Sequence, residues 1–382
     1  MNISKKSLTS LALAMASTTM LGHRASALNL PDPIQIDGGP LGPLQLSGGS
    51  DGFVYAQTGT ADKSGNSILG NRTTGASLGT ALIQLQKTSG VLQFNIEIAA
   101  TDGTPTQGQE ISTAGVDSVG TSPLYVGTIT LAPPGFPLTI TAGEIDCLEG
   151  DESGFSWNNP NLFATGIYAS ENGPSRGVQL TYTAGPVTTS VIYGDGWDTG
   201  VFNFLQASID YTAHNNELNI YYAGNLGKTG LNARTYGKSN VGDYGSYYIN
   251  SQMFGAYDSY THGNLNLVPE IQYVYAKPNA SVGIDQFTSS FGAAMQIDYQ
   301  FGASPYSLGG MVQYFTSNGD ANWYIASHAQ GFGMEVTPTW QNKHLFARTS
   351  IAYLHLMTGG AYGNSGNGKD TLQIGLNAGL IF

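Results

Sequence analysis

The residues with the clearest chemical potential are carboxylates gathered in one stretch of the sequence. Five acids lie within it, namely Glu144, Asp146, Glu149, Asp151 and Glu152, and no Lys or Arg follows before Arg176. Carboxylates that line a narrow passage favour cations, and clustered hard oxygens can also hold calcium. The spacing matches no helix–loop–helix calcium loop, so we predict no metal site. A solvated acidic surface, or one that contacts calcium or lipopolysaccharide, is the competing interpretation.

Other reactive groups give no comparable pattern. The histidines after residue 27 show no paired metal spacing, at His214, His262, His328, His344 and His355. The G-x-S-x-G motif of serine hydrolases is absent from the sequence. We therefore expect no cofactor, no metal and no catalytic centre.

The composition narrows the class of protein. The 382 residues include 52 Gly and 22 Tyr, whereas charged residues make up 10% and apolar residues 41%. Intrinsic disorder requires high charge and few aromatic residues, and a net charge of −12 disfavours nucleic-acid binding. Beyond the N-terminus no apolar run is long enough for a transmembrane helix. A Gly- and Tyr-rich, all-β chain remains.

Residues 1–27 have the pattern of a secretory signal peptide. A short basic head precedes the apolar stretch 8–21, which is too short to span a bilayer, and Ala25-Ser26-Ala27 forms a cleavage pattern. We expect cleavage after Ala27. A Pro- and Gly-rich leader segment follows at 28–42.

From residue 43 to residue 382 the chain alternates apolar and polar residues, which is typical of β-strands. In the last segment Leu372, Ile374 and Leu376 share one face, while Gln373 and Asn377 lie on the other. Sixteen strands are predicted, at 43–58, 75–86, 91–101, 123–131, 136–146, 175–183, 186–193, 202–212, 216–223, 244–258, 263–276, 290–301, 305–317, 331–340, 343–357 and 370–382.

Short and long connections alternate between these strands, as in an up-and-down antiparallel transmembrane β-barrel with short periplasmic turns and long extracellular loops. One strand face carries Leu, Ile, Phe and Tyr, and the other carries Gly, Asn, Gln, Ser and Thr with few residues able to fill a core. We therefore predict a barrel of about 16 strands over 43–382, apolar outside and wet inside. A soluble β-sandwich with an aromatic core is the alternative.

Two stretches resemble known families. The C-terminal alternation that ends at Phe382 resembles the assembly signal of Gram-negative outer-membrane barrels. Residues 139–198 resemble the OmpL-like putative β-barrel porin family, through Gly143-Glu144-Ile145, Gly150-Asp151-Glu152, Asn159-Pro160-Asn161, Gly177-Val178 and Gly194-Asp195-Gly196-Trp197-Asp198. The resemblance implies an outer-membrane channel for small solutes. The chain departs from the family at Glu144 and Asp195, and both changes add acidity, so an anion preference is not implied.

The loop 147–174 follows the fifth predicted strand. In barrels of general-porin type the corresponding loop folds inward, so by fold analogy we expect it to constrict the lumen. Further lumen-facing candidates come from the strands, namely Glu97, Asp210, Glu270, Asp298 and Glu335, with Arg348 as the main basic counterpart. This balance predicts a modest preference for cations.

The expected function is that of an outer-membrane porin for passive diffusion of ions and small hydrophilic solutes. The expected partners are these solutes, outer-membrane lipid, lipopolysaccharide and the barrel assembly machinery, and a homotrimer stays open. Two other functions also stay open: an outer-membrane barrel enzyme of lipase or protease type, and a soluble secreted β-rich adhesin.

Overall fold

The computed structural model describes residues 28–101, 103–111, 123–197, 202–226, 246–280, 283–321 and 323–382. The predicted signal peptide, residues 1–27, lies outside the described residues. No helix in the described ranges is long and apolar enough to cross a membrane.

The chain forms one antiparallel sheet that closes on itself. Its strands are β1 (Ile34–Asp37), β2 (Pro43–Gln57), β3 (Thr74–Lys87), β4 (Leu92–Thr101), β5 (Leu124–Leu131), β6 (Leu138–Ile145), β7 (Ser175–Ala184), β8 (Val187–Gly194), β9 (Phe204–Ala213), β10 (Asn216–Gly224), β11 (Ser251–His262), β12 (Leu265–Ala276), β13 (Thr288–Gln300), β14 (Tyr306–Asn318), β15 (Gln330–Asn342), β16 (Leu345–Thr358) and β17 (Asp370–Ile381). The short helices are η1 (Gly39–Leu41), η2 (Ser156–Asn158), η3 (Tyr168–Ser170) and α3 (Ser246–Ile249).

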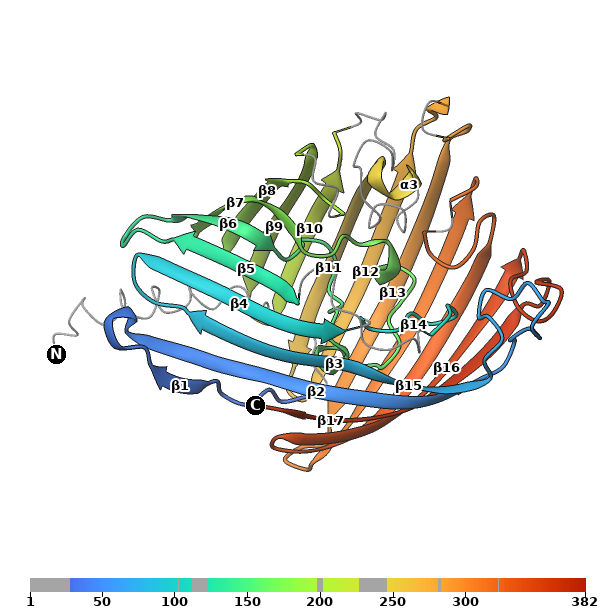
Figure 1. Ribbon diagram of the computed structural model, residues 1–382, viewed down its shortest axis with the longest axis horizontal. Coiled ribbons are helices and arrows are strands. Elements are labelled where there is room, and N and C mark those ends of the chain that lie inside the picture. Colours follow the sequence, from blue (N-terminus) through green and yellow to red (C-terminus); the bar gives the residue numbers. More distant parts are fainter. Residues whose placement is uncertain are drawn as a thin grey trace.

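Strands β2 to β17 follow one another around the wall (Figure 1). Strand β17 pairs with β2 from Gln373 opposite Gln57 to Ile381 opposite Gly49, which closes the ring. The predicted all-β barrel of sixteen antiparallel strands is therefore confirmed. Closure leaves the ring of sixteen strands without an edge strand, which spanning β structure requires because hydrocarbon offers no hydrogen bonds.

A seventeenth strand lies in the N-terminal segment. Strand β1 pairs with the start of β2, with Ile34 opposite Leu46. The C-terminal residue Phe382 exchanges backbone hydrogen bonds with Gly48 just beyond that point. Strands β1 and β17 therefore lie end to end along the same edge of β2. Both faces of the four residues of β1 are exposed, so they carry no burial pattern from which the sequence could predict a strand.

One predicted strand is displaced. The sequence placed the tenth barrel strand at 244–258, whereas β11 spans Ser251–His262, and helix α3 occupies 246–249. The chain reverses at Gly263, whose φ of +60° suits a tight hairpin turn, rather than at 259–262. The Tyr residues before residue 251 give that segment the composition of a strand. Only the geometry of the turn distinguishes the predicted position of the strand from the observed one.

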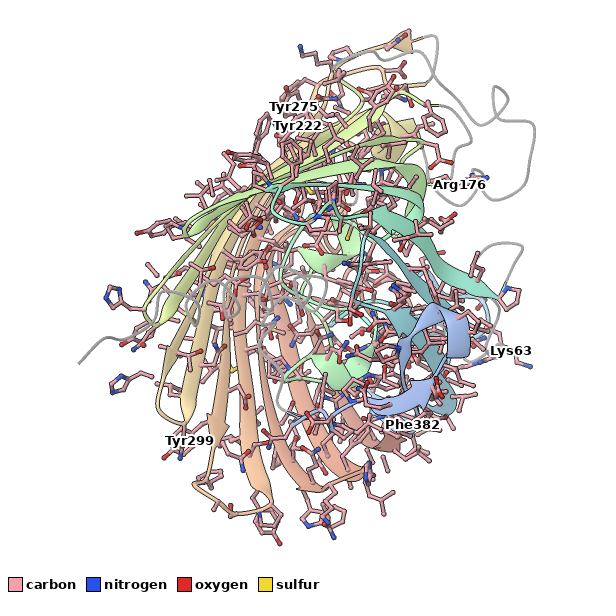
Figure 2. All side chains as sticks on the ribbon, turned by 90° about the vertical axis from the view of Figure 1, so that its left-hand side faces the viewer. Lys63, Arg176, Tyr222, Tyr275, Tyr299 and Phe382 are labelled. Atoms are coloured by element: carbon pink, nitrogen blue, oxygen red, sulfur yellow. The ribbon has the colours of Figure 1, made fainter. Side chains whose placement is uncertain are left out.

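The outer surface is apolar, as predicted. Ile83, Ile129 and Ile271 are 55%, 61% and 53% exposed, whereas the inward Gln296 and Gln373 are 2% and 0% exposed. Outward aromatic residues lie near both ends of the barrel, with Tyr222 and Tyr275 near one end and Tyr299 near the other (Figure 2). Such bands are typical of the two membrane interfaces.

The inner face of the barrel wall carries more apolar side chains than the sequence predicted. Near the long-loop end, Phe315, Leu354 and Leu356 point inward and join a buried cluster with Trp323 and Tyr324 of the β14–β15 connection. The prediction of an inner face with few core-filling residues is therefore wrong for this half of the barrel. Loops that fold inward bring apolar side chains with them, and the adjoining wall must cover those side chains.

Candidate functional site

The β6–β7 connection, residues 146–174, folds into the barrel, and we call it the inner loop. The backbone N–H of Phe163 donates to Glu335 Oε1 on β15 over 3.2 Å, and that of Gly166 donates to Gln313 Oε1 on β14 over 2.8 Å. Both partners lie on the wall opposite β6 and β7 (Figure 1). The inner loop therefore crosses the lumen, where it can set the width of the channel.

Glycines on the far wall form the seat of the inner loop. A Cβ atom at Gly309 on β14 would lie 2.1 Å from the carbonyl oxygen of Pro160, and one at Gly375 on β17 would lie 2.3 Å from Leu162 Cδ2. At Gly292 on β13 the distance to Ile167 Cγ1 would be 2.7 Å. The inner loop can lie this close to the wall only because these positions carry no side chain.

A second segment, residues 103–111 of the β4–β5 connection, lies beside the inner loop, and we call it the second loop. The backbone N–H of Gln107 donates to the Ala164 carbonyl over 2.9 Å, and that of Ala164 donates to the Pro105 carbonyl over 2.8 Å. The Gln107 side chain reaches the Met334 carbonyl on β15, and the Gly108 N–H reaches Gln373 Oε1 on β17. Two loops therefore lie side by side inside the barrel.

Sequence reasoning missed the second loop. Its contacts are made by neutral amides, which carry no charge pattern, and by the bare backbone of Gly333, where a Cβ would lie 2.1 Å from Gln107 Oε1. The available signal was Gln107 and Gln109 in one of the longest predicted connections, 102–122, but that composition is also typical of an exposed loop.

Arg348 on β16 anchors the inner loop to the wall. Its guanidinium is buried and donates to the carbonyl oxygens of Ser156 and Asn159 over 2.8 and 3.0 Å, and to Asn377 Oδ1 over 2.9 Å. Asp51 on β2 accepts hydrogen bonds from the Ser156 hydroxyl and from Asn377 in the same network. The residue that the sequence offered as the basic counterpart in the lumen is therefore fully engaged in holding the inner loop.

We expect Arg348→Gln to lower the thermal stability of the barrel strongly. Removing one partner from a buried, hydrogen-bonded charge network typically costs about 3–5 kcal/mol, because the remaining charge of Asp51 is left uncompensated. The measurement is the unfolding midpoint of the purified barrel in detergent. The exposed Arg72 provides the matched control, Arg72→Gln. Equal midpoints for the two variants would contradict the anchoring role.

The acids of the inner loop are buried and bonded to the loop itself. Glu152 accepts hydrogen bonds from the N–H and the hydroxyl of Thr165, and Glu149 accepts one from the N–H of Asn172. Burial raises the pKa of Glu149 to about 8, although the bond from Asn172 opposes the shift. Burial likewise raises the pKa of Glu152 to about 7 against the bonds from Thr165. Both carboxyls therefore change charge close to neutral pH.

The structure brings some predicted acids together and leaves others apart. Glu270 on β12 accepts a hydrogen bond from the backbone N–H of Asp151 and is close enough to Asp151 and Glu152 for the charges to interact. Glu335 also meets the inner loop, at Phe163. Asp151, Glu152 and Glu270 therefore lie together, whereas Glu335 meets the inner loop separately, on β15.

The remaining candidates lie elsewhere. Glu97 on β4 accepts bonds from Gln84 and Asn95 over 2.7 and 2.9 Å. Asp210 on β9 accepts one from Asn219 of the next strand over 2.5 Å, and Asp298 lies on the inner face of β13. Glu144 is half-buried at the end of β6, and Asp146 is exposed at the start of the inner loop. These acids are spread over several walls rather than gathered in one ring.

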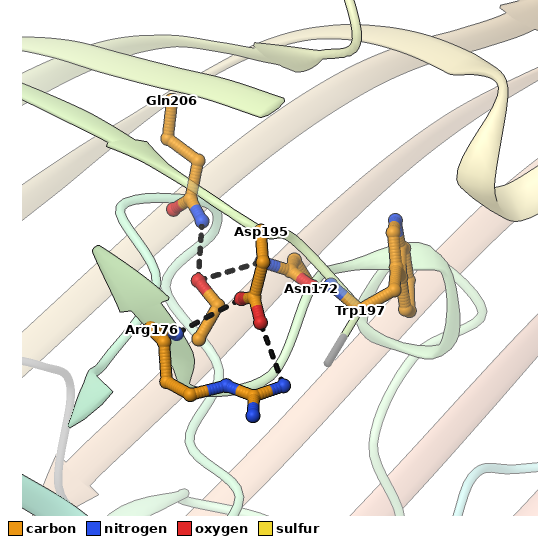
Figure 3. A network of polar contacts seen from close by, with 6 residues as sticks. Asn172, Arg176, Asp195, Trp197 and Gln206 are labelled. Carbon is orange, nitrogen blue, oxygen red and sulfur yellow. Dashed lines mark hydrogen bonds and ion pairs between the residues drawn. The ribbon is translucent and has the colours of Figure 1, made fainter. Parts of the chain in front are cut away.

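A polar network fixes the point where the inner loop returns to the wall (Figure 3). Arg176 forms an ion pair of 2.7 Å with Asp195, and the N–H of Trp197 donates to Asn172 Oδ1 over 2.7 Å. Glu144 lies directly opposite Arg176 in the β6–β7 register. The two acidic departures from the family pattern, Glu144 and Asp195, therefore flank the same arginine.

The architecture defines the class of protein. A closed antiparallel barrel of sixteen strands with an apolar exterior, aromatic end bands and inward-folded loops is that of a bacterial outer-membrane channel. The family model described as Putative beta-barrel porin-2, OmpL-like, matches residues 43–382. The chain belongs to this family and is an outer-membrane porin.

Solved structures share the fold at low sequence identity. OmpT of Vibrio cholerae, expressed in the outer membrane, is 10% identical with a TM-score of 0.58, covering 92% of this chain and 100% of that one. The anion-selective porin from Comamonas acidovorans is 11% identical with a TM-score of 0.57, covering 89% and 99%. Salmonella typhi OmpF, in complex with daunomycin, is 14% identical with a TM-score of 0.54, covering 91% and 100%. Comparison with curated protein sequences finds no significant match.

Proposed function

We propose that this porin prefers cations over anions and that the inner loop and the second loop together set its size limit. The supporting observation is the charge balance inside the barrel. Arg348 is the one basic side chain that the described part of the chain buries, whereas the buried acids include Asp51, Glu97, Glu270 and Glu335. The buried acids outnumber Arg348, whose charge is balanced by Asp51 in the same network, so the net field in the lumen is negative.

The test is the reversal potential of single channels in a planar bilayer that separates two concentrations of potassium chloride. We expect the sign that corresponds to faster passage of potassium than of chloride. At about pH 9, where both carboxyls are ionised, the double variant Glu149→Gln/Glu152→Gln should reduce the potential toward zero, since both charges lie on the inner loop. A potential of the opposite sign in the unmodified protein would contradict the cation preference.

The selectivity of the Comamonas porin is not carried over to this chain. That protein is described as anion-selective, but at 11% identity the likeness concerns the fold alone. Ion preference depends on individual side chains at the constriction, and the acids in the inner loop are features of this sequence.

The chain's other expected properties belong to the same proposal. We infer passive transport without catalysis, export with cleavage after Ala27, a leader segment at 28–42 and contact with lipopolysaccharide. We also infer recognition of the C-terminal strand ending at Phe382 by the barrel assembly machinery. A homotrimer gains support from the fold, because Vibrio cholerae OmpT, 11% identical, has a structure described as a trimer form.

A further inference from the structure

The outer surface carries a cavity where strands β9, β10 and β11 reach the short-turn end of the barrel. It has a volume of about 530 Å³, and its lining includes Tyr211, His214, Asn216, Leu218, Asp258 and Tyr260. The short turns of the barrel class face the periplasm. The cavity therefore lies at the level of the periplasmic membrane interface.

The register places the lining residues on the lipid-facing side. Leu218 lies opposite Tyr211 on one neighbouring strand and opposite Asp258 on the other, and Leu218 and Tyr211 are 37% and 45% exposed. The residues next to them point inward: Asp210 bonds to Asn219, and Tyr257 packs against the interior cluster. Asp258 is therefore a carboxylate on the outside of the barrel.

Asp258 has unused bonding capacity. Its Oδ2 accepts a hydrogen bond from Asn216 Nδ2 over 3.3 Å, whereas its Oδ1 is buried without a hydrogen-bond partner among the described residues. Its carboxylate also forms no ion pair with any Lys or Arg in that part of the chain. A carboxylate beside the membrane with one buried, unbonded oxygen is costly unless a ligand compensates it. The cavity thus provides both space and an unmet need for a cationic donor.

We propose that this cavity binds the primary ammonium group of a phospholipid headgroup, with Asp258 as the acceptor. An ammonium N–H would donate to the Asp258 carboxylate, which a rotation about its Cβ–Cγ bond presents to the cavity, in a charge-assisted hydrogen bond. The rings of Tyr211 and Tyr260 line the same cavity and offer aromatic surfaces to a cation. One carboxylate and one amide supply too few hard ligands for a divalent cation. The headgroup depth of the cavity favours a lipid over a solute from the lumen.

The test measures which lipids the purified barrel retains. The protein is equilibrated with phosphatidylethanolamine, phosphatidylcholine and phosphatidylglycerol of identical acyl chains, and bound lipids are counted by native mass spectrometry. We expect retention of phosphatidylethanolamine to exceed that of the other two by about tenfold, because only it presents ammonium N–H donors. Asp258→Asn should abolish the preference.

The matched control is Asp210→Asn, which makes the same change two strands away, on β9, but on the inner face. It should keep the preference for phosphatidylethanolamine. If Asp258→Asn does not assemble, Tyr211→Leu carries the test, since it removes one ring of the cavity and should weaken the preference. Equal retention of the three lipids, an unchanged preference in the assembled variants, or equal loss in Asp210→Asn would overturn the proposal.

Discussion

Replacing Gly309 by valine should displace the inner loop and widen the channel. A Cβ at this position would lie 2.1 Å from the Pro160 carbonyl, a backbone atom that cannot rotate away. Overpacking of this kind costs about 1–3 kcal/mol, which shifts the balance between seated and displaced loop by about fivefold to 150-fold. Valine suits a strand, so the wall itself should still form. Single-channel recordings should show a larger conductance state that is rare in the unmodified protein.

The neighbouring glycine supplies the control. Gly310 lies on the same strand, but a Cβ there would have no atom closer than 3.6 Å. Gly310→Val should therefore keep the original conductance and size limit. The uptake of sugars of increasing size into liposomes gives an independent readout, because a displaced loop admits larger solutes. An unaltered conductance and size limit in Gly309→Val would show that the inner loop does not define the constriction.

Cation preference should rise with pH across the neutral range. Burial raises the pKa of Glu149 to about 8 and that of Glu152 to about 7, so each carboxyl is neutral well below its pKa and negative above it. The inner loop thus gains up to two negative charges between about pH 6 and about pH 9, and we expect the ratio of potassium to chloride permeability to increase by about twofold. Reversal potentials recorded at several pH values measure the effect.

The seated position of the inner loop should become less stable as the pH rises, whereas the cation preference increases. Because burial raises both pKa values above those of free carboxyls, the seated loop binds more protons than a displaced one. Its seating is therefore favoured at acidic pH, weakens as the pH rises from the free-carboxyl pKa of 4.5, and levels off above about 8. Channel noise and the share of larger conductance states should grow over the same interval.

Two sets of variants isolate the groups responsible. Glu149→Gln/Glu152→Gln should flatten the pH dependence of selectivity, because neither amide titrates. Asp62, in the β2–β3 connection, provides a matched acid, since the bonds from Ser64 hold its pKa below the usual value and its charge stays constant over this range. Asp62→Asn should keep the slope. A pH-independent selectivity in the unmodified protein would contradict the assignment.

Local patterns in the sequence determined the barrel. Alternation with a period of two, as at Leu372, Ile374 and Leu376, places residues on faces without any knowledge of their distant partners. The alternation of short and long connections then determined the up-and-down order and the end from which the long loops emerge. Both signals operate over a few residues, which is why fifteen of the sixteen predicted barrel strands needed only small adjustments at their ends.

The tenth barrel strand marks the limit of that reasoning. Tyr-rich residues before position 251 alternate like a strand, yet β11 begins at Ser251 and ends at the turn formed by Gly263. Registers that differ by a few residues look alike in composition. The choice between them depends on which backbone can turn with a positive φ and on the pairing with β12.

Only the tertiary structure decided how the inner loop and the second loop are placed inside the barrel. The sequence located the acids of residues 144–152 and the long connection around them, but its contacts with Gly309 and Arg348 join positions about 150 to 190 residues apart in the chain. The second loop reaches Gln373 across 265 residues. Such contacts produce no periodic pattern in the sequence. A glycine that packs against a loop cannot be distinguished by sequence from a glycine in a turn. Closure of the wall brings them together, so that two acids of one run, Glu149 and Glu152, become carboxyls buried inside the barrel.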